Sequence, residues 1–97
     1  MTYKMTRSEV QALEQVLSLV ITQKPDSMED KLLISVMNNL YKKVVNKLLD
    51  LKPKYTLKID AITELAFYVF FENQIFYPDY AGIIIKNICD KIEKQYV

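Results

Sequence analysis

The side chains that most often perform acid–base and nucleophilic chemistry are nearly absent from this sequence. It contains no histidine and a single cysteine, Cys89. Without histidine, neither a Ser–His nor a Cys–His nucleophile pair can form, and one cysteine cannot supply the ligands of a structural zinc site. The single glycine, Gly82, excludes a glycine-rich phosphate loop. We therefore expect a protein that is not an enzyme and that binds neither a cofactor nor a metal.

Two pairs of carboxylates remain as candidates for proton transfer. Glu29 is followed directly by Asp30, and Asp60 is followed one helical turn later by Glu64. Both pairs fall where helices are expected to begin, and the positive end of a helix dipole favours acidic side chains there. Cys89 lies on the apolar stripe of an expected helix, as inert core cysteines do. None of these residues is therefore expected to be catalytic.

Lysines concentrate in the middle of the chain, where they could contact phosphate groups or an acidic protein surface. Segment 42–58 holds six of the twelve lysines against one acid, Asp50, although the net charge of the whole chain is only +1. Lysines near the end of a helix also complement its dipole without binding anything. With one arginine, Arg7, bidentate reading of guanine is scarcely available. The six candidate nucleic-acid-binding residues are Lys42, Lys43, Lys47, Lys52, Lys54 and Lys58.

Aromatic residues gather in one stretch, AFYVFFENQIFYPDY at 66–80. It holds all four phenylalanines and three of the seven tyrosines of the chain. A stacking platform for bases needs basic residues among the aromatics, and this stretch contains none. Burial in a core and exposure at a protein interface are the stronger interpretations, because large exposed apolar patches mark interaction surfaces.

Hydrophobic periodicity predicts helices that position these groups. The first is expected to begin at Thr6, which matches a capping box with Glu9, and to end before Pro25. The second is expected from about residue 27 to Lys52, and the last from residue 78 or 79 to the end of the chain. Each of these three segments has one apolar and one polar face, as surface helices do.

The third expected helix, from about Ala61 to Glu72, lacks a polar face in its C-terminal half. A helix that is apolar all round is expected to be buried all round, which places it in the middle of the other three. The scarcity of glycine and proline also favours a few long elements over many turns. The sequence therefore predicts an all-α fold, a single four-helix domain over residues 1–97 with a central apolar third helix.

Residues 54–59, KYTLKI, alternate between polar and apolar types, as the residues of a strand do. A lone strand has no ladder partner, so a strand here would require a second chain. We therefore expect an extended linker or an early first turn of the third helix.

These observations favour a small non-catalytic protein-interaction module, a regulator or accessory factor that binds a protein partner and itself as a homodimer. It is expected to be cytoplasmic and to have no membrane contact, because no apolar run approaches the roughly 20 residues that span a bilayer. The alternatives are a nucleic-acid-binding accessory protein that uses the six lysines, and an enzyme or ligand binder with a pocket near Tyr68 and Tyr77. The candidate partner-binding residues are Phe67, Tyr68, Phe71, Phe76, Tyr77 and Tyr80.

Overall fold

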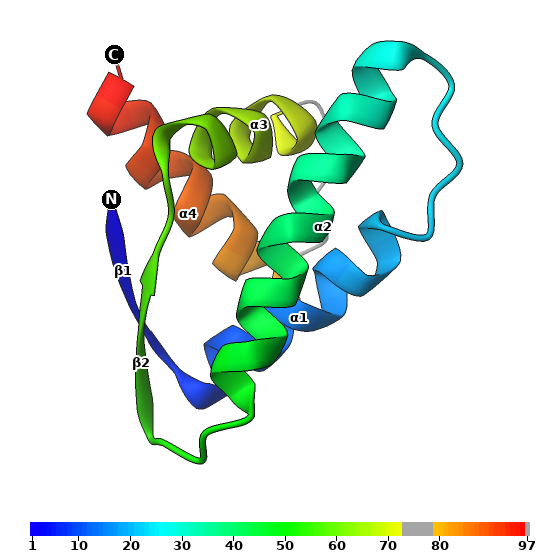
Figure 1. Ribbon diagram of the computed structural model, residues 1–97. Coiled ribbons are helices and arrows are strands. Elements are labelled where there is room, and N and C mark those ends of the chain that lie inside the picture. Colours follow the sequence, from blue (N-terminus) through cyan, green and yellow to red (C-terminus); the bar gives the residue numbers. More distant parts are fainter. Residues whose placement is uncertain (73–78, 97) are drawn as a thin grey trace.

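The computed structural model describes residues 1–72 and 79–96, which form four helices and a two-stranded sheet (Figure 1). The mostly helical architecture predicted from the sequence is confirmed, and the small sheet is a departure from it. In chain order the elements are β1 (Thr2–Thr6), α1 (Arg7–Val20), α2 (Met28–Leu48), β2 (Lys54–Lys58), α3 (Ala61–Phe71) and α4 (Tyr80–Tyr96).

The sheet corrects the expectation for residues 54–59. They are neither a linker nor a helical turn, because β2 pairs antiparallel with β1, from Thr2 opposite Lys58 to Thr6 opposite Lys54. The partner strand therefore comes from the same chain. One face of the sheet packs on the core, and the other is exposed and consists of threonines and lysines alone. The exposed face carries Thr2, Lys4, Thr6, Lys54, Thr56 and Lys58.

The first helix occupies the middle of the fold. The predicted capping box is confirmed at its start: the Thr6 amide donates to Glu9 Oε1 at 2.9 Å, and the Glu9 amide donates to Thr6 Oγ1 at 3.3 Å. Leu13 and Leu17 are fully buried. Helix α1 packs against α2, α4 and both strands, so the central position belongs to α1.

The prediction of a central third helix is therefore wrong. Helix α3 packs against α2 and α4, at one side of the fold (Figure 1). Phe67 and Phe71 point into the core, whereas Ile62, Leu65 and Val69 are exposed. An apolar outer face looks the same in a sequence as a second buried face, and this is why periodicity placed the helix in the centre.

Cys89 lies on the buried face of α4, so its prediction as a core residue is confirmed. Burial disfavours the thiolate, and nearby acids, Asp90 foremost, add to the effect; together they raise the pKa of Cys89 to about 11.

Cys89 should make the folded state sensitive to alkali. Below pH 9 the thiol is protonated in both the folded and the unfolded state, and its contribution to stability is fully present. As pH rises from 9 through about 11, the unfolded state loses its proton first, so stability falls. The expected slope from this group is at most about 1.4 kcal/mol per pH unit. Between pH 8 and 10, the free energy of unfolding in urea should fall less steeply with pH in Cys89→Ala than in the wild type. Identical slopes would show that Cys89 does not cause the sensitivity to alkali.

Candidate protein-binding site

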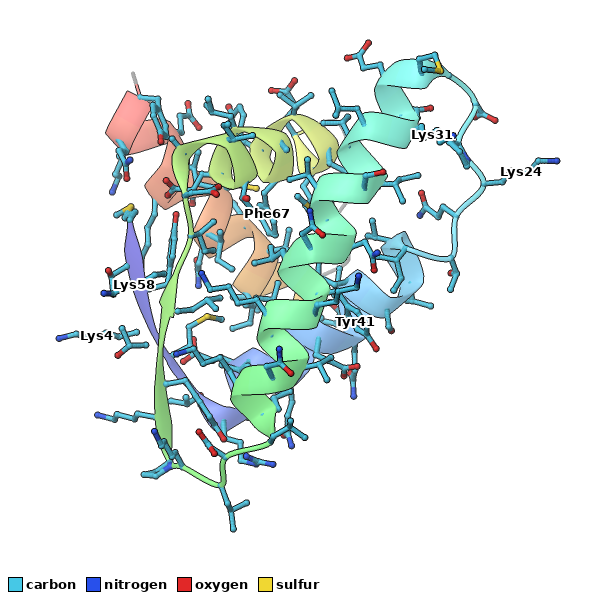
Figure 2. The ribbon with its side chains drawn as sticks, in the orientation of Figure 1. Lys4, Lys24, Lys31, Tyr41, Lys58 and Phe67 are labelled. Atoms are coloured by element: carbon cyan, nitrogen blue, oxygen red, sulfur yellow. The ribbon has the colours of Figure 1, made fainter. Side chains whose placement is uncertain are left out.

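The structure divides the six predicted partner-binding residues. Phe67 and Phe71 belong to the core, with ring centroids 4.7 Å apart, so their assignment to a partner surface is wrong. Figure 2 shows Phe67 under α3, facing the interior. Tyr68 is half-buried, and Tyr80 is exposed, with its hydroxyl 3.0 Å from that of Ser8.

The remaining two predicted partner-binding residues, Phe76 and Tyr77, lie outside the described residues. A homodimer contact through the loop that contains them stays a prediction, as does a ligand pocket near Tyr68 and Tyr77.

The outer face of α3 is an exposed apolar surface. Ile62, Leu65 and Val69 lie one and two turns apart on this face and are 74%, 45% and 42% exposed. We call these three residues the α3 stripe. Between Asp60 and Glu72 the only charged residue is Glu64, which points the opposite way and is buried. The stripe is therefore an uncharged aliphatic surface about two turns long.

A groove lies at the Val69 end of the α3 stripe. It has a volume of about 370 Å³ and runs between the end of α3 and the start of α2. Val69 and Phe70 form one side, and Leu33 and Ile34 lie opposite. Its rim is polar and contains more acids than bases, which makes the groove an extension of the stripe with charged edges. The rim residues are Gln23, Lys24, Asp26, Glu29 and Asp30.

The opposite face of α3 holds a buried carboxylate at a position where the sequence predicts an ordinary acid of the first helical turn. Asp60 caps the helix as expected, with its Oδ1 accepting from the Thr63 amide at 2.8 Å, and the hydrogen bonds from Thr63 lower its pKa. Glu64, however, is only 1% exposed. It lies one turn before Phe67 and two before Phe71, on the same face. That spacing was the available signal of its burial.

Glu64 joins three elements by its two oxygens. The Tyr3 hydroxyl of β1 donates to Oε2 at 2.6 Å, and the Tyr96 hydroxyl of α4 donates to Oε1 at 3.2 Å. The amino group of Met1 lies 3.6 Å from Oε1. Burial, with the hydrogen bond to Glu64, raises the pKa of Tyr3 above its ordinary value. A buried carboxylate requires such partners, and this arrangement holds β1, α3 and α4 together.

The six predicted lysines are divided between α2, the sheet and, for Lys52, the connection between the two. Lys42, Lys43 and Lys47 lie on α2, whereas Lys54 and Lys58 lie on the outer face of the sheet beside Lys4. Lys47 is half-buried, and the Lys43 ammonium donates to the Lys58 carbonyl.

Together with Lys4, the outer face of the sheet forms a basic surface, which Lys43 of α2 reaches at its β2 edge. Figure 2 shows Lys4 and Lys58 at this sheet, far from Lys24 and Lys31 near the start of α2. Lys4 is not among the predicted lysines, because hydrophobic periodicity gives no sign of the short strand that carries it.

Comparison with known proteins identifies no relative: no protein-family model, no curated protein and no solved structure matches this chain. In the part of the chain that the structure describes, no helix is long and apolar enough to span a bilayer. Over the same residues, no three side chains of the metal-binding types His, Cys, Asp and Glu come together as a metal site.

Proposed function

We propose that this protein is a small cytoplasmic interaction module without catalytic activity, a regulator or accessory factor that binds a protein partner and a second copy of itself. The α3 stripe is the proposed contact surface. The observation that supports this most is the exposure of Ile62, Leu65 and Val69 in a row, on a helix whose other face is already buried.

Burial of the α3 stripe against a partner would be favourable, because its three side chains are exposed in the single chain. Fully burying one large aliphatic side chain contributes about 1.5–3 kcal/mol, and three such residues on one face make a contiguous patch. The centres of interfaces are also depleted of charge, as is the face between Asp60 and Glu72. The α2–α3 groove beside Val69 offers room for a side chain of the partner.

Self-association through this surface would be two-fold symmetric, because an uncharged stripe is complementary to a copy of itself. In an antiparallel pair of α3 helices, Asp60 of each copy would lie near Glu72 of the other. These exposed acids repel one another, and salt screens the repulsion. We therefore expect self-association to strengthen with ionic strength.

Leu65→Asp is the variant that tests the α3 stripe. Sedimentation equilibrium of the wild type at micromolar and higher concentrations should approach about twice the chain mass of 11.4 kDa. Leu65→Asp should stay monomeric because it places a charge in the centre of the contact, and its far-ultraviolet circular dichroism should be unchanged because Leu65 is exposed.

The matched control is Leu19→Asp, since Leu19 is an exposed leucine on α1. It should dimerise as the wild type does. A wild type that remains monomeric throughout would refute self-association, and equal losses in the two variants would refute its assignment to α3.

Nucleic-acid binding by the lysines remains a second candidate. One observation favours it, namely that the outer face of the sheet carries Lys4, Lys54 and Lys58 with no acidic neighbour on that face. Of the α2 lysines, Lys43 reaches the Lys58 carbonyl at the edge of the sheet and Lys47 is half-buried, so a contact along all six predicted residues is less favoured than a contact at the sheet.

A further inference from the structure

The outer edge of β1 has backbone N–H and C=O groups that form no hydrogen bond with β2. Met1 and Ile59 exchange hydrogen bonds in both directions, at 2.9 and 3.0 Å. Bonded and non-bonded pairs alternate along an antiparallel ladder, so Tyr3 is bonded to its partner strand whereas Thr2 and Lys4 are not. The N–H and C=O groups of Thr2 and Lys4 therefore point away from β2.

Two of the other outward-facing backbone groups are already bonded. On β2, the Lys58 carbonyl accepts from the Lys43 ammonium of α2. On β1, the Thr6 amide donates to Glu9 in the capping box. By the same alternation Lys54 and Thr56 face outward on β2, so each strand has an open stretch of edge, and on β1 it is formed by Thr2 and Lys4. An open edge can accept a further strand.

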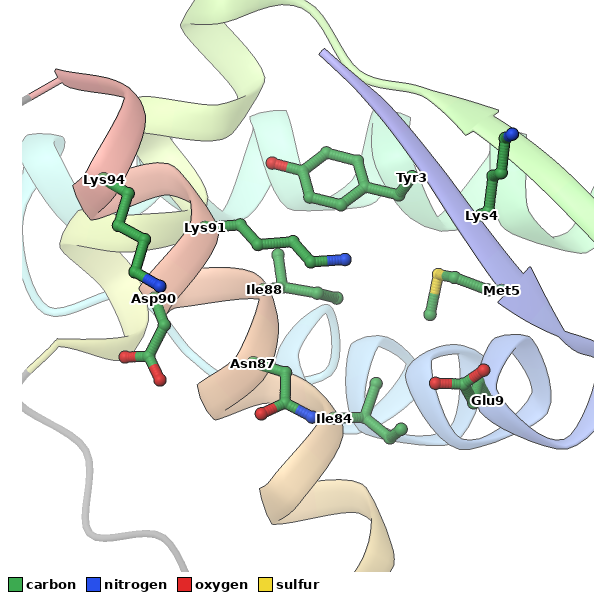
Figure 3. A pocket seen from close by; sticks show the side chains of 10 residues that line it. All are labelled: Tyr3, Lys4, Met5, Glu9, Ile84, Asn87, Ile88, Asp90, Lys91 and Lys94. Carbon is green, nitrogen blue, oxygen red and sulfur yellow. The ribbon is translucent and has the colours of Figure 1, made fainter.

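A groove of about 290 Å³ runs along this edge, between β1 and α4 (Figure 3). Tyr3 and Met5, which point inward, and Lys4, which points outward, all line it. Contact with both faces of the strand places the groove at the edge of β1. The opposite wall is α4, from which Lys91 reaches across toward β1, with its Nζ 5.8 Å from the centre of the Tyr3 ring.

The charges around the edge favour an acidic occupant. The groove is lined by Lys4, Lys91 and Lys94 and by two acids, Asp90 and Glu9. Of these acids, Glu9 already accepts a hydrogen bond in the capping box. The adjoining outer face of the sheet carries only threonines and lysines. A strand added beside β1 would therefore lie next to Lys4 on its outer side and Lys91 on its inner side.

We propose that the open edge of β1 binds an extended acidic segment of a partner protein, which adds to the sheet as a third strand. Main-chain hydrogen bonds to Thr2 and Lys4 would hold the segment, and the flanking lysines would select acidic side chains. A second copy of β1 fits poorly here. Antiparallel self-pairing would bring the Lys4 side chains of the two copies opposite or diagonal to each other, and like charges so placed are destabilising.

Three fluorescent peptides test both parts of the proposal by anisotropy. The first alternates Glu and Val, the second has Lys in place of Glu, and the third is the first with alternate backbone amides methylated. The Glu peptide should bind. The Lys peptide should bind at least about tenfold more weakly, because its charges meet lysines. The methylated peptide should bind with at least about tenfold lower affinity than the Glu peptide, as expected when two backbone hydrogen bonds are removed.

Two charge reversals locate the peptide. Lys91→Glu should weaken binding of the Glu peptide by about tenfold or more. Lys42→Glu carries the same charge change on an exposed site of α2 and should leave binding unchanged. Peptide binding should also slow hydrogen exchange at the amides of Thr2 and Lys4, which would be the direct sign of strand addition.

Several results would overturn this proposal. Equal binding of the methylated peptide would rule out a ladder, and equal binding of the Lys peptide would rule out acidic selectivity. Tight binding of a single-stranded oligonucleotide that displaces the Glu peptide would assign the surface to nucleic acid. The edge does not depend on the α3 stripe: Leu65→Asp should bind the Glu peptide as the wild type does, whether or not the wild type dimerises.

Discussion

Phe67→Ala should destabilise the fold by about 3–5 kcal/mol, a large part of what a domain of this size has. Phe67 is only 1% exposed and contacts Phe71 in the core. Truncation removes the ring from apolar surroundings and leaves a cavity that the neighbouring helices fill only in part. Urea unfolding followed by circular dichroism measures the loss.

Ile62→Ala is the matched control for this prediction, because Ile62 lies on the same helix but is 74% exposed. Measured at a concentration where the chain is monomeric, it should change stability by no more than about 0.5 kcal/mol. The contrast between the two variants reports the orientation of α3. Similar costs for both would mean that the helix is buried on both faces, as the sequence had suggested.

Glu64→Ala should cost about 2–4 kcal/mol, the second largest effect that we expect. The change leaves the buried Tyr3 hydroxyl without its acceptor, and an unpaired buried polar group costs about 1–3 kcal/mol. It also opens a cavity between β1, α3 and α4. The free energy of unfolding in urea, measured near neutral pH, tests this prediction.

Two further variants separate the hydrogen bond from the cavity. Glu64→Gln preserves the size of the side chain and one acceptor oxygen, so it should cost less than Glu64→Ala. Tyr3→Phe removes the donor, and in a double-mutant cycle its effect should be coupled to that of Glu64→Ala. Glu93→Ala, at an exposed acid of α4, should be neutral within about 0.5 kcal/mol. Additive effects of the Tyr3 and Glu64 changes would show that the two residues do not interact.

The helix starts were predictable from sequence because capping is local. Thr6, Ser27 and Asp60 each accept from the amide three residues ahead. The donor and the acceptor of a cap lie within a few residues of each other, so a short stretch of sequence is enough to predict the cap. The same holds for Cys89, whose burial follows from the stripe on its own helix.

The sheet and the buried carboxylate were missed because their causes are distant. Residues 54–59 look like a strand, but their partner is some 50 positions away in a segment too short to stand out. Glu64 looks like an ordinary acid of a first helical turn until Tyr3 and Tyr96 are brought to it. The exposure of the α3 stripe was not predicted for a third reason: the type of an apolar residue does not tell whether it lies in a core or on an outer surface.

The pairing of β1 with distant segments also sets an order of events during synthesis. Strand β1 is synthesised before the segments it contacts, because Glu64 follows Tyr3 by 61 residues and the ladder partner β2 precedes Glu64 by only a few residues. The helical hairpin of α1 and α2 can form while β1 is still unpaired, because the contacts within the hairpin are closer in sequence than those of β1. Closure of the long loop from β1 to α3 then comes late. Until that moment both edges of the nascent strand are unpaired, and they are open to pairing with other growing chains.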